Sequence, residues 1–233
     1  YVFIMVDLYR KKRLGIFENY FDDADLTLNI DHHENSKKES NYIISDENIS
    51  STSEMIYNLI NEFDIKIDRN IATLLYAGIL TDTAGFSHRL TPKTFLVTSK
   101  LLECDIDYKY ITKKTFLERT MKEVKALSKM LNEINFDIFH YIIINREDPI
   151  FCSLEYSMLF KKMVPILKNI EGINVLGIFL IDNDKVFGEF KANINIDMSK
   201  LAEKFGGGGH KDSAGFESKL GIEEILKISK EYI

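Results

Sequence analysis

Two strand candidates that end at acidic residues mark the beginning of the chain, and the first of them is entirely apolar. Residues 2–6 (VFIMV) stop at Asp7, and residues 26–30 (LTLNI) stop at the sequence DHH. An all-apolar run predicts a strand buried on both faces, as in the parallel sheets of α/β proteins. The ligand crevice of an open parallel sheet lies beyond the carboxyl ends of its strands. We therefore expect the polar side chains that end these two runs to line a binding site.

The segments that follow have the 3.6-residue period of helices. A Ser51-x-x-Glu54 capping box precedes an amphipathic stretch, and Thr91-Pro92 supplies an N-cap followed by proline at the first helical position. A further segment, IATLLYAGIL, is apolar nearly all round, which indicates a buried helix, and Asp82 lies just beyond it. The pattern predicts three helices, at about 53–63, 71–80 and 92–102.

The second half of the chain changes character twice. A charged stretch with helical periodicity, residues 108–135, indicates a connector, and the pattern after it is that of strands and short helices. We predict an α/β fold of two lobes joined by a helical linker, with boundaries at 1–119, 120–136 and 137–233. The strands expected in the second lobe are 138–144, 173–182 and 185–192, and its helices are 199–205 and 221–232.

Composition excludes several classes of protein. Hydrophobic residues make up 45% and charged residues 28% of the 233 positions, which is typical of a globular protein and excludes a disordered or fibrous one. The net charge of −6 disfavours a general nucleic-acid binder, because such binding depends on many Lys and Arg contacts with phosphates. A small site that handles phosphate through metal ions stays compatible with this charge.

Cysteine content and hydropathy set the expected location. Two cysteines, Cys104 and Cys152, provide no disulfide framework, which favours a reducing, cytoplasmic setting. The longest apolar runs are far shorter than the ~20 residues of a membrane span, so we expect no membrane partner. The chain opens on an apolar run with no cationic leader and no methionine, which suggests that the natural start lies upstream.

The first candidate site combines carboxylates with imidazoles: Asp7, Asp31, His32, His33 and Asp82. Oxygen ligands mixed with imidazole suit Mn²⁺ or Mg²⁺ better than a thiolate-seeking metal. Two such ions are able to clamp the attacking and leaving oxygens of a phosphoryl transfer. The alternative is that these residues are caps and turn formers at the ends of strands.

The second candidate site is the run Gly206-Gly207-Gly208-Gly209-His210. Consecutive glycines cost backbone entropy on folding, so the run requires a reason. Bare backbone N–H groups in such a loop are able to surround an anion, with His210 at the rim. The alternative is a flexible turn or helix C-cap, which needs one glycine only.

These motifs resemble those of the DHH/DHHA1 phosphoesterase family. The resemblance rests on IDHH at 30–33 and GGGGHKDSAGF at 206–216, with support from VDLYRKKRLG at 6–15, LTDTAGF at 80–86 and FKANINIDMSKLAEKF at 190–205. It is strongest to small two-lobe members: oligoribonucleases, pAp phosphatases and phosphodiesterases of cyclic-di-AMP or pApA. It implies a parallel-sheet DHH lobe followed by a smaller, mixed-sheet DHHA1 lobe.

The resemblance also implies roles for residues of the first lobe. Asp7 corresponds to the carboxylate that bridges two metal ions, and His32 and Asp82 correspond to further metal ligands. Asp31 corresponds to a carboxylate that orients an imidazole, and His33 corresponds to the histidine that faces the substrate phosphate. The implied cofactor is a pair of Mn²⁺ ions, with Mg²⁺ or Co²⁺ as substitutes. The family's first motif, His-x-x-x-Asp-x-Asp, has no counterpart here, so we expect the DHH lobe to be N-terminally incomplete.

In the second lobe, the resemblance implies that the glycine run grips the nucleotide and its terminal phosphate. The residues concerned are Gly207, Gly208, Gly209 and His210. Lys191 occupies the position where the family usually has arginine, so it meets a phosphate as a point charge without a bidentate fork.

The sequence therefore predicts a cytoplasmic, Mn²⁺-dependent phosphoesterase. We expect it to hydrolyse pAp, RNA of two to five nucleotides, or linear and cyclic dinucleotides, and to have no long nucleic-acid partner, since no basic stripe is visible. A homodimer is left open. Two rival functions also stay open: a nucleotide-binding module without catalysis, and a hydrolase of inorganic pyrophosphate or polyphosphate.

Overall fold

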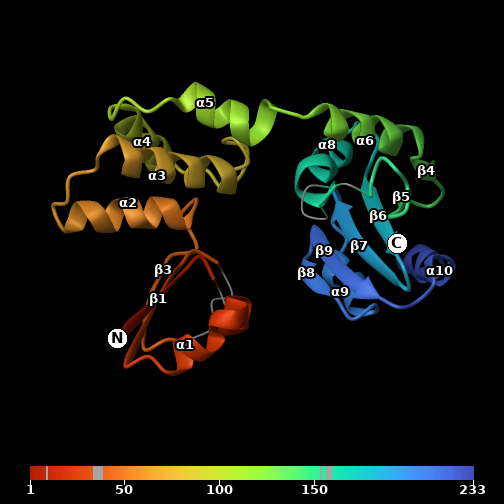
Figure 1. Cartoon of the computed structure of the whole chain (residues 1–233), viewed down its shortest axis with the longest axis horizontal. Coiled ribbons are helices and arrows are strands. Elements are labelled where there is room, and N and C mark those ends of the chain that lie inside the picture. The colour runs from red at the N-terminus through yellow and green to blue at the C-terminus, as the bar shows by residue number, and fades with distance from the viewer. Residues whose placement is uncertain (9, 34–38, 153, 156–158) are drawn as a thin grey trace. The chain divides into compact units, whose positions relative to one another are not determined.

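A computed structural model describes residues 1–8, 10–33, 39–152, 154–155 and 159–233 of the chain. The chain folds into two compact units, residues 1–118 and 119–233 (Figure 1). Each unit has its own sheet and its own hydrophobic core. No described helix has the length and the apolar character that a membrane span requires.

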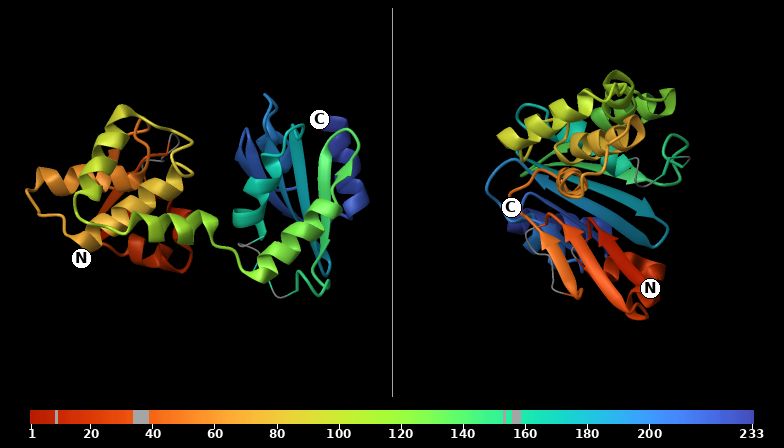
Figure 2. Two further views of the ribbon diagram at one scale, coloured as in Figure 1. Left: turned by 90° about the horizontal axis from the view of Figure 1, so that it is seen from above. Right: turned by 90° about the vertical axis from the view of Figure 1, so that its left-hand side faces the viewer.

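The first unit is built on a parallel sheet of three strands in the order β1–β2–β3 (Figure 2). The strands are β1 (Val2–Val6), β2 (Leu26–Asp31) and β3 (Tyr42–Ser45). The first two were predicted, whereas the four-residue β3 was not. The parallel register brings the carboxyl ends of β1 and β2 to one edge of the sheet. Asp7 lies at this edge after β1, and Asp31-His32-His33 lies there at the end of β2.

Strand β1 differs from the prediction of burial on both faces. Met5 is buried, but Val2, Ile4 and Val6 on the opposite face are 57%, 56% and 44% exposed. The same face of β2 is covered, because Ile30 packs against Met55 of a helix that follows β3. Among the described residues, that cover does not extend over β1.

Helices complete the first unit. The principal ones are α2 (Thr52–Glu62), α3 (Arg69–Asp82) and α4 (Pro92–Leu102), all near their predicted positions. Thr91 is the predicted N-cap of α4, and it forms a capping box with Thr94 that was not predicted. Residues Ile79 and Leu101 are wholly buried between α3 and α4, whereas Leu74 is 73% exposed, so the apolar helix α3 is buried on part of its surface only. The shorter elements are a 3₁₀ turn (Lys11–Phe17), α1 (Glu18–Asp22), α5 (Tyr108–Thr112) and a π turn (Lys113–Leu117).

The second unit contains a six-stranded mixed sheet with the order β4–β5–β6–β7–β9–β8. Strands β5 and β6 are parallel, and the remaining pairs are antiparallel. The strands are β4 (Asn135–Phe136), β5 (His140–Asn145), β6 (Val175–Asp182), β7 (Lys185–Ala192), β8 (Gly208–His210) and β9 (Ser213–Ser218). The predicted two-lobe α/β fold, parallel in the first lobe and mixed in the second, is confirmed.

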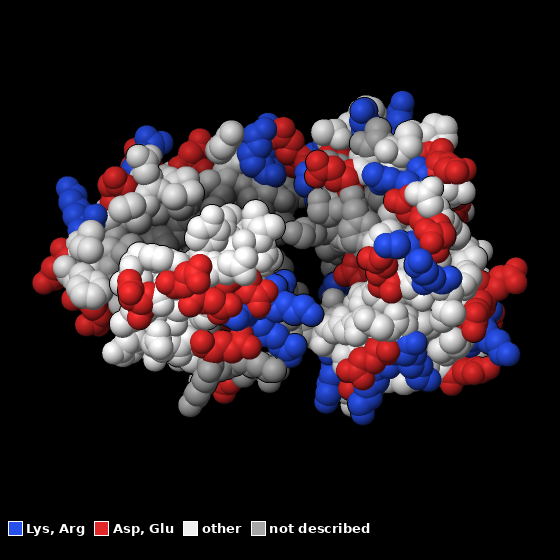
Figure 3. Space-filling model, turned by 60° about the horizontal axis from the view of Figure 1, so that its bottom comes forward, with Lys and Arg blue, Asp and Glu red and all other residues white. Residues whose placement is uncertain are grey.

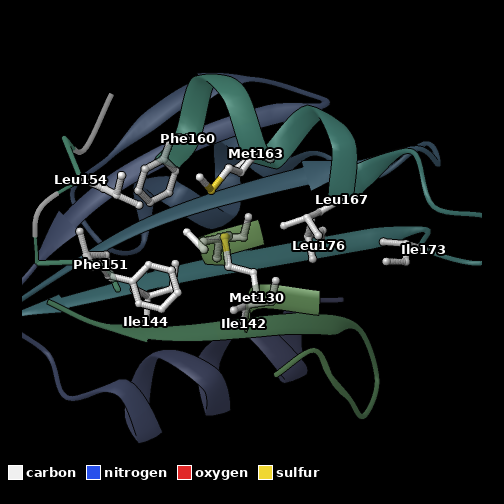
Figure 4. Close-up of a cluster of buried hydrophobic side chains, with 14 residues drawn as sticks. Met130, Ile142, Ile144, Phe151, Leu154, Phe160, Met163, Leu167, Ile173 and Leu176 are labelled. Atoms are coloured by element: carbon white, nitrogen blue, oxygen red, sulfur yellow. The ribbon is translucent and has the colours of Figure 1, made fainter. Parts of the chain in front are cut away.

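Strand β6 explains why the second unit has a core on both faces of its sheet. Its alternating residues Leu176 and Ile178 enter one core, shown in Figure 4, while Val175 and Phe179 enter the other. The covering helices are α6 (Met121–Asn132), a π turn (Leu159–Met163) and α8 (Val164–Lys168) on the first face, and α9 (Met198–Glu203) and α10 (Ile222–Tyr232) on the second. Helix α6, which spans most of the predicted linker, packs into this unit through the fully buried side chain of Met130.

Charged side chains of both signs are interspersed over the face shown in Figure 3. Described ion pairs include Lys129 with Asp148 and Lys185 with Glu217. Mixed charges of this kind give no one-sign field that would track an extended polyanion on this face.

A candidate metal centre and a glycine-lined edge

Asp7 sits immediately after β1 in a backbone conformation that few non-glycine residues adopt. Its φ angle is 60°, in the left-handed region, where aspartate and asparagine are tolerated better than other residues. The backbone N–H of Asp7 donates to the carbonyl of Ile30 at 3.0 Å. The Thr52 hydroxyl donates to Asp7 Oδ1 at 2.9 Å. The turn therefore aims a half-exposed carboxylate across the edge of the sheet.

His32 lies against this carboxylate and against a second one. Its Nε2 atom is 3.7 Å from Asp7 Oδ1 and 3.6 Å from Asp82 Oδ2, and Asp82 is the last residue of α3. The His32 side chain is only 6% exposed, and its Nδ1 atom has no hydrogen-bond partner among the described residues. The carboxyl ends of β1, β2 and α3 thus each supply one potential metal donor, and these are Asp7, His32 and Asp82.

The donor set fits a divalent ion. Two donors that share one ion at about 2.1 Å lie roughly 3.0–4.2 Å apart, depending on the angle between them, and both separations at His32 fall in that range. Donor atoms of Asp7, His32 and His33 also lie within 4.8 Å of one another. Oxygen with imidazole is the mixture that Mn²⁺ and Mg²⁺ accept.

Asp31 holds the second histidine. Its Oδ1 atom is 2.6 Å from His33 Nδ1 and accepts, at 3.4 Å, from the backbone N–H of the same residue. Asp31 is fully buried, whereas the His33 side chain is 27% exposed. A buried carboxylate against one ring nitrogen fixes the orientation of an imidazole whose other side reaches solvent.

Burial and the neighbouring Asp7 carboxylate raise the pKa of Asp82, although His32, His33 and Arg89 act in the opposite direction. A carboxyl group with a raised pKa contributes stability that is fully present below its ordinary pKa and is lost as the pH rises through the raised value. In the absence of metal, the ionised Asp82 is therefore a cost to the fold at neutral pH.

We expect Asp82→Asn to stabilise the metal-free protein at pH 7, because asparagine keeps the uncharged state at every pH. The Tm of the metal-free variant should therefore lie above that of the wild type at pH 7. Melting curves in a chelator from pH 3 to pH 8 test this, and the difference should vanish below about pH 3.5, where both forms are uncharged. An asparagine variant that melts below the wild type at pH 7 without metal would contradict the electrostatic account.

The glycine run of the second unit is partly strand rather than loop. Gly208, Gly209 and His210 form β8, which pairs with β9 at the edge of the sheet. A side chain on Gly207 would place Cβ 2.2 Å from the carbonyl oxygen of Gly215, whereas Cβ on Gly208 would meet nothing within 4 Å. Gly209 has a φ of 152°, and its Cβ would lie 2.5 Å from the carbonyl oxygen of Ser213. The sequence prediction of a loop was wrong for residues 208–210, because pairing with β9 outweighs the low strand propensity of glycine.

Lys191 lies beside this edge. It pairs across β7 and β9 with Ser213, and Ser213 pairs in turn with His210 of β8. The Lys191 ammonium group is 2.6 Å from Glu189 Oε1 and also donates to the Ser213 hydroxyl. The structure thus places Lys191 of β7 and His210 of β8 on either side of Ser213 of β9. Glu189 is an added carboxylate that the sequence reasoning did not single out.

Family profiles match both units. The profile described as "DHH family, N-terminal domain" matches residues 1–79, and the DHHA1 domain profile matches residues 159–233. The chain belongs to the DHH/DHHA1 family. The two matched regions contain four of the five candidate residues of the metal centre and all five candidate residues of the glycine-lined edge, and Asp82 lies just beyond the first region.

Curated relatives of the chain include a bacterial phosphoesterase. The chain is 28% identical over 200 residues to the protein named bifunctional oligoribonuclease and PAP phosphatase NrnA of Bacillus subtilis, a match that covers 81% of this chain. The chain spans 61% of the length of that relative and 64% of the length of three other bacterial relatives. The DHH/DHHA1 chain described here thus corresponds to less than two thirds of each of these proteins.

Solved structures share the fold. A Bacteroides fragilis protein described as exopolyphosphatase-related superposes with a TM-score of 0.89 at 23% identity, covering 99% of this chain and 70% of that one. RecJ from Thermus thermophilus, solved in complex with Mn²⁺, superposes with a TM-score of 0.52 at 11% identity, covering 99% of this chain and 44% of that one. At these identities the likeness establishes the architecture of the family and no more.

Sequence reasoning missed Thr52 as a neighbour of the candidate metal centre. The Ser51-x-x-Glu54 pattern was interpreted as a capping box, and Ser51 does cap α2 by accepting from the backbone N–H of Glu54 at 3.1 Å. The Glu54 carboxylate instead accepts from the hydroxyls of Ser50 and Thr94. A capping glutamate flanked by several hydroxyl residues is the sequence signal that could have pointed to this cluster.

Proposed function

We propose that this DHH/DHHA1 chain belongs to a Mn²⁺-dependent phosphoesterase that hydrolyses short nucleotides. The proposal rests on one observation above all: Asp7 and Asp82 place carboxylate oxygens within 3.7 Å of the same nitrogen of the buried His32. Such a donor set suits a hard divalent ion, and NrnA of B. subtilis is named for phosphoester cleavage. The presence of a second Mn²⁺ ion remains part of the proposal.

Each residue of the metal centre has an assigned task. Divalent ions, when bound, generate a nucleophile from water near neutral pH and hold the phosphate oxygens during in-line displacement. Asp7, His32 and Asp82 hold the ions. His33, which the buried Asp31 orients, stabilises the charge that develops on the phosphate or gives a proton to the leaving oxygen.

The second unit is assigned the remote part of the substrate. Gly208 offers backbone next to open space, His210 provides a polar side chain on the same strand, and Lys191 provides one on β7, beyond the intervening β9. Because Glu189 already neutralises Lys191 in part, this edge suits one terminal phosphate rather than a series of phosphates. The substrates that fit are pAp, RNA of two to five nucleotides, and pApA or cyclic-di-AMP.

We expect hydrolysis to slow as RNA lengthens beyond about five nucleotides, by analogy with the small ~4–16-nucleotide sites of dedicated single-strand binders. The experiment is a rate series on 5′-phosphorylated RNA from two to twenty-four nucleotides, with pAp and cyclic-di-AMP alongside, in Mn²⁺, in Mg²⁺ and in a chelator. Undiminished cleavage of the 24-mer would refute the short-substrate proposal. Nucleotide binding without turnover would favour the binding module, and faster cleavage of polyphosphate than of any nucleotide would favour the inorganic substrate.

We expect His210→Ala to weaken activity on nucleotides while sparing a small artificial phosphodiester. Binding energy from a remote group raises turnover only when the substrate carries that group. The measurement is kcat/KM for pAp, for a dinucleotide and for bis-p-nitrophenyl phosphate, and His140→Ala in the same unit is the matched control. Equal losses on all three substrates would mean that His210 acts in the chemical step or in folding.

A further inference from the structure

Thr52 is a buried residue whose side chain reaches out of its own helix. It occupies the first turn of α2 and is 4% exposed, and its hydroxyl donates to Asp7 Oδ1 at 2.9 Å. Helical threonines commonly bond a carbonyl one turn back, as partly exposed Thr73 and buried Thr98 do here. Thr52 instead joins residues 45 positions apart, the start of α2 and the end of β1.

The Asp7 carboxylate needs such support, because the backbone of Asp7 does not by itself fix the orientation of the side chain. A non-glycine residue at φ 60° is held in a sparsely populated region only when its surroundings over-determine it. The backbone bond to Ile30 fixes the peptide, and the Thr52 hydroxyl fixes one carboxylate oxygen. That same oxygen, Oδ1, is the one 3.7 Å from His32 Nε2.

The turn that carries Thr52 is itself anchored by Glu54. This carboxylate is fully buried, and one of its oxygens accepts from the Ser50 hydroxyl and, at 2.9 Å, from the Thr94 hydroxyl of α4. The Ser51 side chain caps α2 by accepting from the backbone N–H of Glu54. Glu54 thus ties the residue before the cap and the neighbouring helix α4 to one rigid point two residues from Thr52.

We propose that Thr52 is a positioning residue for the Asp7 carboxylate, and that buried Glu54 acts through it by fixing the start of α2. For the metal, the inference rests on the proposed function. The hydrogen bond between Thr52 and Asp7 does not depend on the proposed function, because both residues belong to this chain and no metal is needed for the contact. The chain Glu54–Thr52–Asp7 therefore links the packing of α2 against α4 to the direction of a metal ligand.

The first test needs no metal. Thr52→Val and Asp7→Gly are combined in a double-mutant cycle, and glycine is chosen because it tolerates the left-handed backbone. Hydrogen exchange of peptides from β2 and α2 in a chelator reports the stability of the first unit by itself. We expect the two sites to be coupled by about two- to tenfold in the opening equilibrium, as for an ordinary hydrogen bond. Additive effects would overturn the inference.

The second test measures Mn²⁺ affinity from the paramagnetic resonance signal of the free ion. Thr52→Val should weaken binding by about tenfold or more, the usual cost of removing the hydrogen-bond partner of a ligand. Thr52→Ser keeps the hydroxyl and should remain within about threefold of the wild type. Thr73→Val in α3 is the matched control and should have no effect.

The outcomes separate this inference from the proposed function. A wild-type protein that binds no Mn²⁺ would refute the proposed metal centre, while the metal-free cycle would still decide the contact between Thr52 and Asp7. Equal losses in Thr52→Ser and Thr52→Val would reduce Thr52 to a packing role and overturn the inference. If Thr52→Val fails to fold, Thr52→Ala carries the same expectation.

The role of Glu54 is decided by one more variant. Glu54→Gln should weaken Mn²⁺ binding in the wild-type background and have little further effect in the Thr52→Val background, because both changes interrupt one path. Losses that simply multiply would show that Glu54 acts on the site by another route and would overturn that half of the inference.

Discussion

Asp7→Asn should lose Mn²⁺ binding and catalytic activity together, each by more than about 100-fold, beyond the ~10–100-fold cost of disturbing a residue that merely supports a ligand. The substitution is almost isosteric, tolerates the φ of 60° and retains an oxygen that accepts from Thr52. What it removes is one negative charge next to His32. The expected loss therefore reports metal ligation rather than misfolding.

The chain offers a matched control for this variant. Asp105 is exposed and also has a left-handed backbone, with a φ of 54°, but it follows α4 and belongs to no described cluster of metal donors. Asp105→Asn should leave Mn²⁺ affinity, kcat and Tm unchanged. Asp7→Asn with wild-type affinity and turnover would show that Asp7 is no ligand.

Gly207→Ala should destabilise the second unit strongly, although the substitution is small. Its Cβ would lie 2.2 Å from the carbonyl oxygen of Gly215 and 2.5 Å from Cβ of Phe216, and neither atom belongs to the far end of a flexible side chain. Overpacking of this kind costs about 1–3 kcal/mol. Because Phe216 packs on Phe190 and Phe205, the displacement would spread into one core of the sheet.

Gly208→Ala is the control one residue away, since its Cβ would meet nothing within 4 Å. We expect it to change the free energy of unfolding by less than about 0.5 kcal/mol. Circular dichroism melts and hydrogen exchange of β9 peptides compare the two variants. A second unit equally stable with alanine at 207 and at 208 would mean that β8 and β9 do not approach each other as closely as described here.

Gly207 and Gly208 show what the sequence could not predict about the glycine run. The sequence predicted that the run serves a ligand, and one glycine was the most that the fold was expected to need. In the structure, Gly207 and Gly209 are required by the approach of β9, and Gly206 has a φ of 81°, which favours glycine. At both Gly206 and Gly208, a Cβ would meet nothing within 4 Å. A close contact between two strands that only two residues separate leaves no periodic pattern, so the sequence could not divide the run in this way.

The strands and helices near the metal centre were predicted well, and the reason is local. Apolar runs, the Thr91-Pro92 start of α4 and the acidic ends of β1 and β2 are all encoded within a few residues. The exposure of Val2 and Ile4 was not predicted, because composition indicates that a strand is apolar but not which elements cover it. The roles of Asp31 and His33 remain predictions, supported by their 2.6 Å contact.

The ion pair between Lys191 and Glu189 has a consequence for salt dependence. A protein that neutralises many phosphates releases condensed counterions and loses affinity steeply as salt rises. The Lys191 ammonium group already has the Glu189 carboxylate 2.6 Å away. A phosphate bound at this edge would therefore compete with Glu189 for Lys191, and would not displace anions of the solution from an unpaired lysine. Recognition at the glycine-lined edge should accordingly respond weakly to ionic strength, and Glu189 rather than salt would set how tightly a terminal phosphate is held.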